Sequence, residues 1–267
     1  MNRIDEKFGE LKAAGMKTFI AYITAGDPDL GTTARLVRAL EVSGVDILEL
    51  GIPFSDPVAD GPTIQAASQR ALRKKASLRK IFEMAGRLRK DTAIPMVFMT
   101  YYNPVFKYGV SRFFKSCKRH GIDGVIIPDL PIEEGKEVIR LGRASGVATI
   151  FLIAPTSTAD RINKIADSSR GFIYYVSLTG VTGARRTLPA ETISRIRSIK
   201  SVTRKPVAAG FGISNAKQAG AIARVADGVI VGSAIVRIIE ANRNNPKRML
   251  SEVSRFSKKL AEAIHGT

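Results

Sequence analysis

Tryptophan is absent from the sequence, and cysteine and histidine are almost absent. The 267 residues include no Trp, one Cys (Cys117) and two His (His120 and His265). A single cysteine excludes an internal disulfide, and so few soft ligands leave no cluster that could hold zinc. The sequence therefore predicts neither a metal site nor a redox centre in this chain.

Long apolar runs are missing as well. No stretch approaches the roughly 20 apolar residues that span a bilayer, and the first ten residues are polar and mixed in charge rather than basic and then apolar. We therefore expect a cytoplasmic protein without membrane contact. Linkers rich in Pro, Gly and Ser are also absent, so we expect residues 1–267 to form a single domain.

Acidic residues are scarce relative to basic ones. The chain has 42 Lys and Arg against 24 Asp and Glu, a formal net charge of +18, and such a charge attracts anions of any kind. Basic residues concentrate between positions 70 and 90, where interleaved apolar residues at helical spacing predict the solvent faces of packed helices. No aromatic stacking platform lies among them, which disfavours nucleic-acid binding.

Eight short runs rich in β-branched residues alternate with longer amphipathic stretches. This alternation predicts repeated βα units, and with a length near 250 residues it predicts a (β/α)8 TIM barrel. An amphipathic helix precedes the first strand, and a short helix at 234–240 follows the last one. The predicted strands are 18–24, 46–51, 96–100, 124–127, 148–153, 172–176, 207–209 and 228–231. The predicted helices are 32–43, 110–120, 133–145, 159–167, 190–199, 215–225 and 246–264.

A weak internal repeat supports the equivalence of these units. Segments 44–46, 121–123 and 226–228 each end a helix and lead directly into an apolar strand, the first two through glycine. The alternative fold is an open doubly wound sheet, which usually has a glycine-rich turn after its first strand. Here that turn reads Ala25-Gly26-Asp27-Pro28, which is no dinucleotide fingerprint.

Polar residues at strand ends are the candidate catalytic groups of such a barrel. Glu49 interrupts the apolar run 45–51, and alternation places it opposite Leu48 and Leu50, inside the barrel if those leucines face the helices. Burial would raise its pKa and suit it to proton transfer, although a structural ion pair is the alternative. The rigid loop 52–62 that follows offers two more carboxylates, Asp56 and Asp60, either of which could instead cap a turn.

Glycine-bearing segments follow the last three predicted strands, at 179–183, 210–214 and 232–234. Their backbone N–H groups, together with the N-terminus of the short helix after Ser233, predict a phosphate site. Large apolar side chains would form the remaining walls, unless they only fill the barrel. The candidate wall residues are Tyr22, Tyr101, Ile126, Ile153, Tyr175 and Phe211.

The sequence from Leu48 to Gln65, LELGIPFSDPVADGPTIQ, resembles the signature of the tryptophan synthase alpha subunit family. Segments 22–28, 101–104, 128–131, 180–183 and 210–213 are also similar, so the resemblance covers essentially the whole chain. It implies a lyase that cleaves indole-3-glycerol phosphate to indole and glyceraldehyde 3-phosphate. It also implies a tryptophan synthase beta subunit as partner, in an alpha2beta2 complex, with pyridoxal phosphate in the beta chain and none in this one.

The same resemblance assigns roles to individual residues. It makes Glu49 the acid–base group and Asp60 the group that stabilises the indole N–H. Tyr175 would help to shape the pocket, and Thr182 would lie on a loop that closes over the substrate. Gly183, Gly212, Gly232 and Ser233 would bind the phosphate, and segments 53–56, 103–106 and 129–131 would contact the partner.

Three other functions remain open at this stage. The barrel could be another phosphate-binding lyase or isomerase, or a free-standing indole-3-glycerol phosphate lyase that works without a partner. A non-catalytic protein that binds nucleic acid through its charge is the third. The resemblance does not explain the charge of +18, which could steer an anionic substrate or match an acidic partner.

Overall fold

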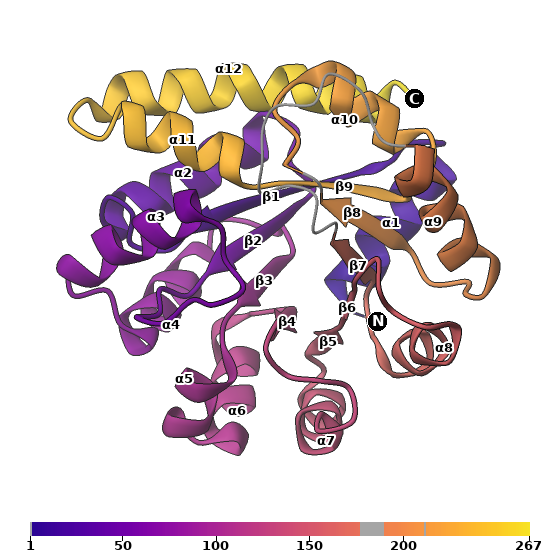
Figure 1. Cartoon of the computed structure of the whole chain (residues 1–267). Helices are drawn as coiled ribbons and strands as arrows, with labels where there is room; N and C mark the ends of the chain where they lie inside the picture. The colour runs from indigo at the N-terminus through magenta and orange to yellow at the C-terminus, as the bar shows by residue number, and fades with distance from the viewer. Residues whose placement is uncertain (1, 177–189, 211) are drawn as a thin grey trace.

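The structure is a computed structural model that describes residues 2–176, 190–210 and 212–267. Within them, parallel strands form the centre and helices surround it (Figure 1). The strands are β1 (Thr18–Thr24), β2 (Ile47–Gly51), β3 (Met96–Met99), β4 (Gly124–Ile126), β5 (Ala148–Ile150), β6 (Leu152–Ile153), β7 (Ile173–Val176), β8 (Val207–Gly210) and β9 (Gly228–Val231).

The helices alternate with these strands along the chain, except that none separates β5 from β6 and that pairs of helices follow β2, β3 and β9. They are α1 (Arg3–Ala13), α2 (Leu30–Val42), α3 (Pro62–Arg73), α4 (Leu78–Leu88), α5 (Tyr102–Tyr108), α6 (Val110–His120), α7 (Lys136–Ser145), α8 (Ala159–Ser168), α9 (Ala190–Ser201), α10 (Ala216–Ala223), α11 (Ser233–Ala241) and α12 (Pro246–His265). No helix in the described ranges is both long and apolar enough to cross a membrane.

The sheet closes on itself through the fifth predicted strand. The strand order is β5-β4-β3-β2-β1-β9-β8-β7-β6, and only Phe151 separates the two end strands in the chain. β5 and β6 are thus two halves of the predicted strand 148–153, and the ring has the eight strands that were expected. The (β/α)8 prediction is confirmed, and the open doubly wound sheet is excluded because β1 pairs with both β2 and β9.

One predicted helix begins later than expected, and one helix was not predicted. The helix expected from residue 133 begins only at Lys136, because the N–H of Glu134 is turned to the carbonyl of Pro131. The segment 103–106, which was expected to contact the partner, lies within this unpredicted helix, α5. Pro104 is compatible with this helix because it falls in the first turn, where a missing N–H breaks no helical hydrogen bond.

Alternate residues of each strand enter two different apolar layers. Ile20, Ile47 and Val97 lie in the barrel interior, whereas their neighbours Leu48 and Phe98 pack against the helices. Ile4 and Phe8 of α1 belong to the interior cluster as well. They approach Gly124, Gly171 and Gly228, all at or before the starts of strands, so α1 closes the N-terminal end of the barrel.

The repeat noticed in the sequence has a structural role. Asp46, Asp123 and Asp227 each stand immediately before a strand, and each carboxylate accepts a hydrogen bond from the neighbouring strand. The donors are, in the same order, the backbone N–H groups of Phe19, Met96 and Val207, at 2.7, 2.9 and 3.0 Å. These bonds fix the register of adjacent strands at the N-terminal end of the barrel. Gly44 and Gly121 precede two of these turns with positive φ angles of 90° and 72°, as predicted.

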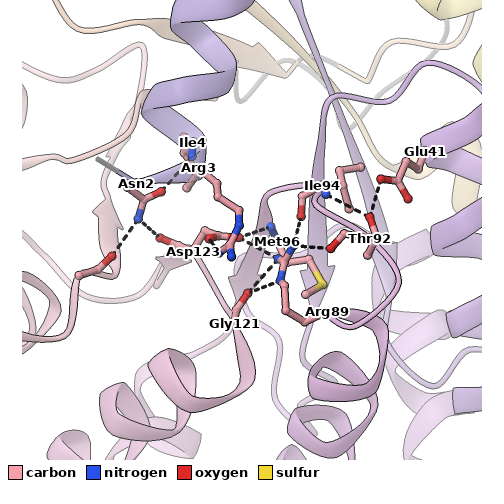
Figure 2. A network of polar contacts seen from close by, with 11 residues as sticks. Asn2, Arg3, Ile4, Glu41, Arg89, Thr92, Ile94, Met96, Gly121 and Asp123 are labelled. Carbon is pink, nitrogen blue, oxygen red and sulfur yellow. Dashed lines mark hydrogen bonds and ion pairs between the residues drawn. The ribbon is translucent and has the colours of Figure 1, made fainter.

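Arg89 is the centre of a polar network at this end (Figure 2). Its guanidinium donates to the carboxylate of Asp123 at 2.9 Å and to the backbone carbonyls of Gly121, Thr92 and Ile94. The basic segment 70–90 is therefore mostly a solvent face, as predicted, but Arg89 is an exception. The contacts at this end of the barrel contribute to stability, because active sites of such barrels lie at the opposite end.

Candidate active site

Glu49 lies on β2 and points into the barrel. Leu48 and Leu50 pack against the helices and Ile47 faces the interior, so alternation places Glu49 inside, as predicted. The side chain is fully buried, and neither carboxylate oxygen has a hydrogen-bond partner among the described residues. Burial, reinforced by the negative charge of Asp60, raises the pKa of Glu49 to about 8.

The loop after β2 holds Asp60 within electrostatic reach of Glu49. The backbone carbonyl of Asp60 accepts a hydrogen bond from Gln65 of α3 at 2.8 Å. The hydroxyl of Tyr101 hydrogen-bonds to the Asp60 carboxylate and accepts the N–H of Ala59 at 2.9 Å. Burial raises the pKa of Asp60 to about 6, and the hydrogen bond from Tyr101 opposes that rise.

The geometry separates the two loop aspartates that the sequence left as alternatives. Asp56 is exposed and accepts a hydrogen bond from the neighbouring hydroxyl of Ser55. Asp60 is the carboxylate whose charge acts on Glu49. Asp60 is therefore the second carboxyl group of the candidate site.

Tyr22 forms the wall next to Glu49. The two residues are paired in register across β1 and β2, and both face the interior. The Tyr22 hydroxyl lies 3.3 Å from the hydroxyl of Thr24. A Cβ atom on Gly51 would fall 2.0 Å from the Tyr22 oxygen, so glycine at this position leaves room for the ring.

Two predicted wall residues point away from the site. Tyr175 and Ile153 both pack in the layer between the barrel and the helices, and the charges that act on Tyr175 belong to α9. Their neighbours Tyr174 and Leu152, paired across β6 and β7, face the barrel interior instead. The predictions of Tyr175 and Ile153 as wall residues are therefore wrong, because in each case the preceding residue, Tyr174 or Leu152, faces the interior.

Tyr174 is the wall residue that sequence reasoning missed. Burial raises its pKa well above the ordinary value, and the next largest cause is the charge of Glu49, so the two side chains lie near each other inside the barrel. A Cβ atom on Gly210 would lie 3.2 Å from the Tyr174 hydroxyl, so the ring reaches β8. The run Phe-Ile-Tyr-Tyr-Val is apolar or aromatic throughout because both faces of the strand are buried. It therefore shows no alternation of polar and apolar residues that would tell which of its residues face the barrel interior.

The remaining described wall residues lie where they were expected. Ile126 belongs to the interior cluster, and Tyr101 is buried against the ring of Phe54, with centroids 5.3 Å apart. Met99 contacts both the interior cluster and the group around Tyr22, and it is a further wall residue that the sequence did not single out.

The N-terminus of α11 adjoins these walls. Gly232 precedes the helix, and a Cβ atom there would lie 3.2 Å from the Cβ of Tyr22. No side chain caps the first N–H groups of α11, which begins with Ser233, and no acidic residue lies in its first turn. Free N–H groups and the helix dipole favour an anion at this point. Gly212 has a positive φ of 61°, a conformation that favours glycine.

Three predicted site residues, Thr182, Gly183 and Phe211, lie outside the described residues. Within the described ranges, no group of three or more His, Cys, Asp or Glu side chains could hold a metal ion. The chemistry that the described groups offer is proton transfer by the buried Glu49, with the partly buried carboxyl of Asp60 close by, next to aromatic walls and a helix N-terminus that favours an anion.

Comparison with known proteins points to one family. The family model for the tryptophan synthase alpha chain matches residues 8–265. The tryptophan synthase alpha chain of Caldanaerobacter subterraneus subsp. tengcongensis is 49% identical over 264 residues, which cover 99% of this chain and 100% of the relative. That of Geobacter sulfurreducens is 47% identical, with 99% of each chain covered. The crystal structure of the alpha subunit from Legionella pneumophila str. Paris superimposes with a TM-score of 0.93 at 38% identity, covering 99% of this chain and 98% of that one. Sequence and fold agree, and the chain belongs to the tryptophan synthase alpha chain family.

Proposed function

We propose that Glu49 and Asp60 together cleave the carbon–carbon bond of indole-3-glycerol phosphate, releasing indole and glyceraldehyde 3-phosphate. Members of this family are lyases, and they carry out this reaction without a cofactor of their own. The observation that carries the residue assignment is the fully buried Glu49, which has no hydrogen-bond partner among the described residues, with the partly buried Asp60 close enough to raise its pKa.

Glu49 acts as both acid and base in this proposal. With a pKa of about 8 it is protonated near neutral pH, and it gives that proton to the ring carbon of indole that bears the glycerol chain. The resulting carboxylate takes the proton of the adjacent glycerol hydroxyl. The oxygen then forms the aldehyde carbonyl, the carbon–carbon bond breaks, and its electron pair returns to the indole ring. One proton enters and one leaves, so Glu49 ends as it began.

Asp60 stabilises the charge that forms during this step. Protonation of the ring carbon makes the indole nitrogen cationic, and an ionised carboxylate beside the N–H lowers the energy of that state. With a pKa of about 6, Asp60 is ionised at neutral pH while Glu49 is not. The difference between these two pKa values supports different roles for the two carboxyls.

The rest of the substrate fits the remaining parts of the site. We assign the phosphate to the N-terminus of α11 at Gly232 and Ser233, with Gly212 nearby, and the indole ring to the walls formed by Tyr22 and Tyr174. By family resemblance, Thr182 and Gly183 would complete the phosphate site and close it. Water would then be excluded from the reacting atoms.

The loops at the same end of the barrel support the docking of a partner. Val58 and Phe106 are 82% and 64% exposed, although both are apolar. The carboxylate of Asp129 accepts the N–H of Tyr102 at 2.9 Å, so the loop after β4 and helix α5 form one surface. The family partner is the beta subunit, which holds the pyridoxal phosphate. We propose that it docks on this surface in an alpha2beta2 complex.

The basic charge has a separate place in the proposal. The exposed cations at the end of α3 and in the turn before α4 are Arg73, Lys74 and Lys75, and they do not belong to the three segments assigned to the partner. We assign them to a solvent face rather than to nucleic-acid binding, and we place the enzyme in the cytoplasm.

The described elements all belong to the one barrel, which supports residues 1–267 as a single domain.

Indole release from indole-3-glycerol phosphate, measured with and without added beta subunit, tests this function. We expect indole from the chain alone and a faster reaction with the beta subunit, and we expect Phe106→Asp to remove only the stimulation. A wild-type chain that binds another phosphosugar tightly and makes no indole would refute the assigned reaction.

A further inference from the structure

We propose that Arg70 is a positioning residue that aligns α3 with α11 and so sets the spacing between Asp60 and the phosphate site. Its Nε and Nη2 donate to the two carboxylate oxygens of Asp27 at 2.9 and 2.8 Å, and its Nη1 donates to Glu240 at 2.6 Å. Only 15% of the Arg70 side chain is exposed. The proposal rests on the function proposed above, because it concerns the anion site of that function.

Asp27 fixes one end of this arrangement to the barrel. It is 2% exposed and lies in the loop directly after β1. The same loop is held by a hydrogen bond of 2.9 Å from the N–H of Gly26 to the hydroxyl of Thr33 in α2. A buried carboxylate without its cation is strongly unfavourable, so Arg70 is constrained to stay on Asp27. Through Arg70, both α3 and α11 are tied to the end of β1.

The ion pair between Arg70 and Glu240 continues an apolar seam. Ile64, Ala67 and Arg70 are spaced by three residues on α3, and Val236 and Glu240 by four on α11, so each set shares one helix face. Ile64, Ala67 and Val236 pack together around Tyr22. Arg70 therefore joins the two helices near their C-terminal ends, away from Asp60 and Gly232.

The other ends of the two helices carry the two halves of the site. α3 begins at Pro62, two residues after Asp60, and its Gln65 holds the Asp60 carbonyl. α11 begins directly after Gly232, at the anion site. A helix moves as a rigid rod, so a shift at Arg70 changes the distance from Asp60 to the phosphate. Misplacement of reacting groups by about 1 Å can slow an enzyme by about a hundredfold.

The test compares Arg70 with Arg89, its counterpart at the opposite end of the barrel. Arg89 is 14% exposed and is likewise bonded to a buried carboxylate, that of Asp123. The variants are Arg70→Met, Arg70→Lys, Glu240→Gln and, as the control, Arg89→Lys. Thermal unfolding reports stability, indole release reports KM and kcat, and calorimetry reports the affinity for inorganic phosphate.

We expect Arg70→Met to raise KM and to weaken phosphate binding by about tenfold or more, with a smaller effect on kcat. Arg70→Lys and Glu240→Gln should act in the same direction but less strongly, because each keeps part of the arrangement. Arg89→Lys should lower the unfolding temperature without changing KM. Arg70→Lys and Glu240→Gln could instead lower the unfolding temperature and leave KM and phosphate affinity unchanged. That result would overturn the proposal and show that Arg70 only stabilises the fold.

Phosphate binding also separates this inference from the proposed reaction. Phosphate affinity can be measured without catalysis. In a protein that already carries Glu49→Gln, the additional substitution Arg70→Met should still weaken phosphate binding about tenfold. A weakened affinity there supports the positioning role even if the wild type releases no indole, which would count against the reaction alone. An unchanged affinity there, in a wild type that is active, overturns the positioning role.

Discussion

The charge of Asp60 acts directly on the buried carboxyl of Glu49 and helps to raise its pKa. Like charges in a site of low dielectric constant do not ionise together easily, so the two groups titrate apart, at about 6 for Asp60 and about 8 for Glu49. Between these values the pair holds one proton, and Glu49 holds it. This is the protonation state in which one carboxyl can donate a proton and the other can stabilise a cation.

Replacing Glu49 with Gln should abolish nearly all indole release, because an amide can neither give nor take the proton. Loss of a general acid–base group typically costs about 10²- to 10⁴-fold in rate. The measurement is indole formation under saturating substrate, with circular dichroism to confirm the fold. If Glu49→Gln releases indole at a rate within about tenfold of the wild type, Glu49 is not the acid–base group.

The same substitution should change how stability depends on pH. The folded-state pKa of Glu49 lies above its ordinary value of 4.5, at about 8, so the folded protein holds this proton more tightly than the unfolded chain. Stability is therefore lost as pH rises from about 4.5 to about 8, by up to about 5 kcal/mol in total. Between about pH 6 and pH 8, urea unfolding should show falling stability for the wild type and a flat profile for Glu49→Gln. Equal slopes for the two proteins would contradict the raised pKa.

Removing the hydroxyl of Tyr101 should shift the acidic limb of the rate profile. The hydrogen bond from Tyr101 lowers the pKa of Asp60, so Tyr101→Phe should raise that pKa above its present value of about 6. Asp60 must be ionised to act, and the acidic limb of kcat/KM against pH should then move to higher pH. Tyr102→Phe, one residue further on α5, is the matched control and should leave the profile in place.

Tyr174 and Tyr175 offer a paired test of which side chain faces the substrate. Tyr174→Phe should lower kcat/KM by several-fold to about tenfold, because Tyr174 faces the barrel interior near Glu49. Tyr175→Phe should lower stability by about 1 kcal/mol and leave kcat/KM unchanged, because that residue faces the helices. Steady-state kinetics and thermal unfolding of both variants decide the matter, and the reverse pattern would restore the original assignment of Tyr175.

The polar network at the N-terminal end should affect stability alone. Asp123 is 5% exposed and accepts hydrogen bonds from Arg3, Arg89 and the N–H of Met96. Asp123→Ala leaves two cations without their carboxylate and should cost about 3–5 kcal/mol in urea unfolding. KM should stay unchanged in the folded fraction, because the substrate site is at the other end of the barrel. A raised KM would show that the two ends are coupled.

Particular residues show how far sequence reasoning reached in the fold. The strand predicted at 18–24 is β1 as it stands, because a β-branched run between clear turn residues is a local signal. The ring closure was predicted from the number of strands, whereas the break at Phe151 was not, since nothing in that run marks it. Helix α5 was missed because a proline in the first turn resembles a loop signal in sequence.

The candidate site shows the same division between local and distant information. Glu49 stood out because a carboxylate in an apolar strand is costly unless it is used. Tyr175 was chosen over Tyr174 because a strand buried on both faces has no alternation to read, and only the pairing with β6 and β8 fixes its phase. Arg70 and Arg89 looked like members of a solvent-exposed basic segment, and their carboxylate partners lie far away in sequence.

The sequence by itself determined the eight βα units, the family and the two carboxyls, because these depend on patterns within a few residues or on one long motif. Only the tertiary structure decided which side of β7 faces the substrate, how far the pKa values of Glu49 and Asp60 are raised, and that Arg70 joins α3 to α11. Each of these depends on burial and on distances between segments that closing the barrel brings together. Local sequence patterns do not contain these distances, so the pKa values of the site residues are determined by the tertiary structure.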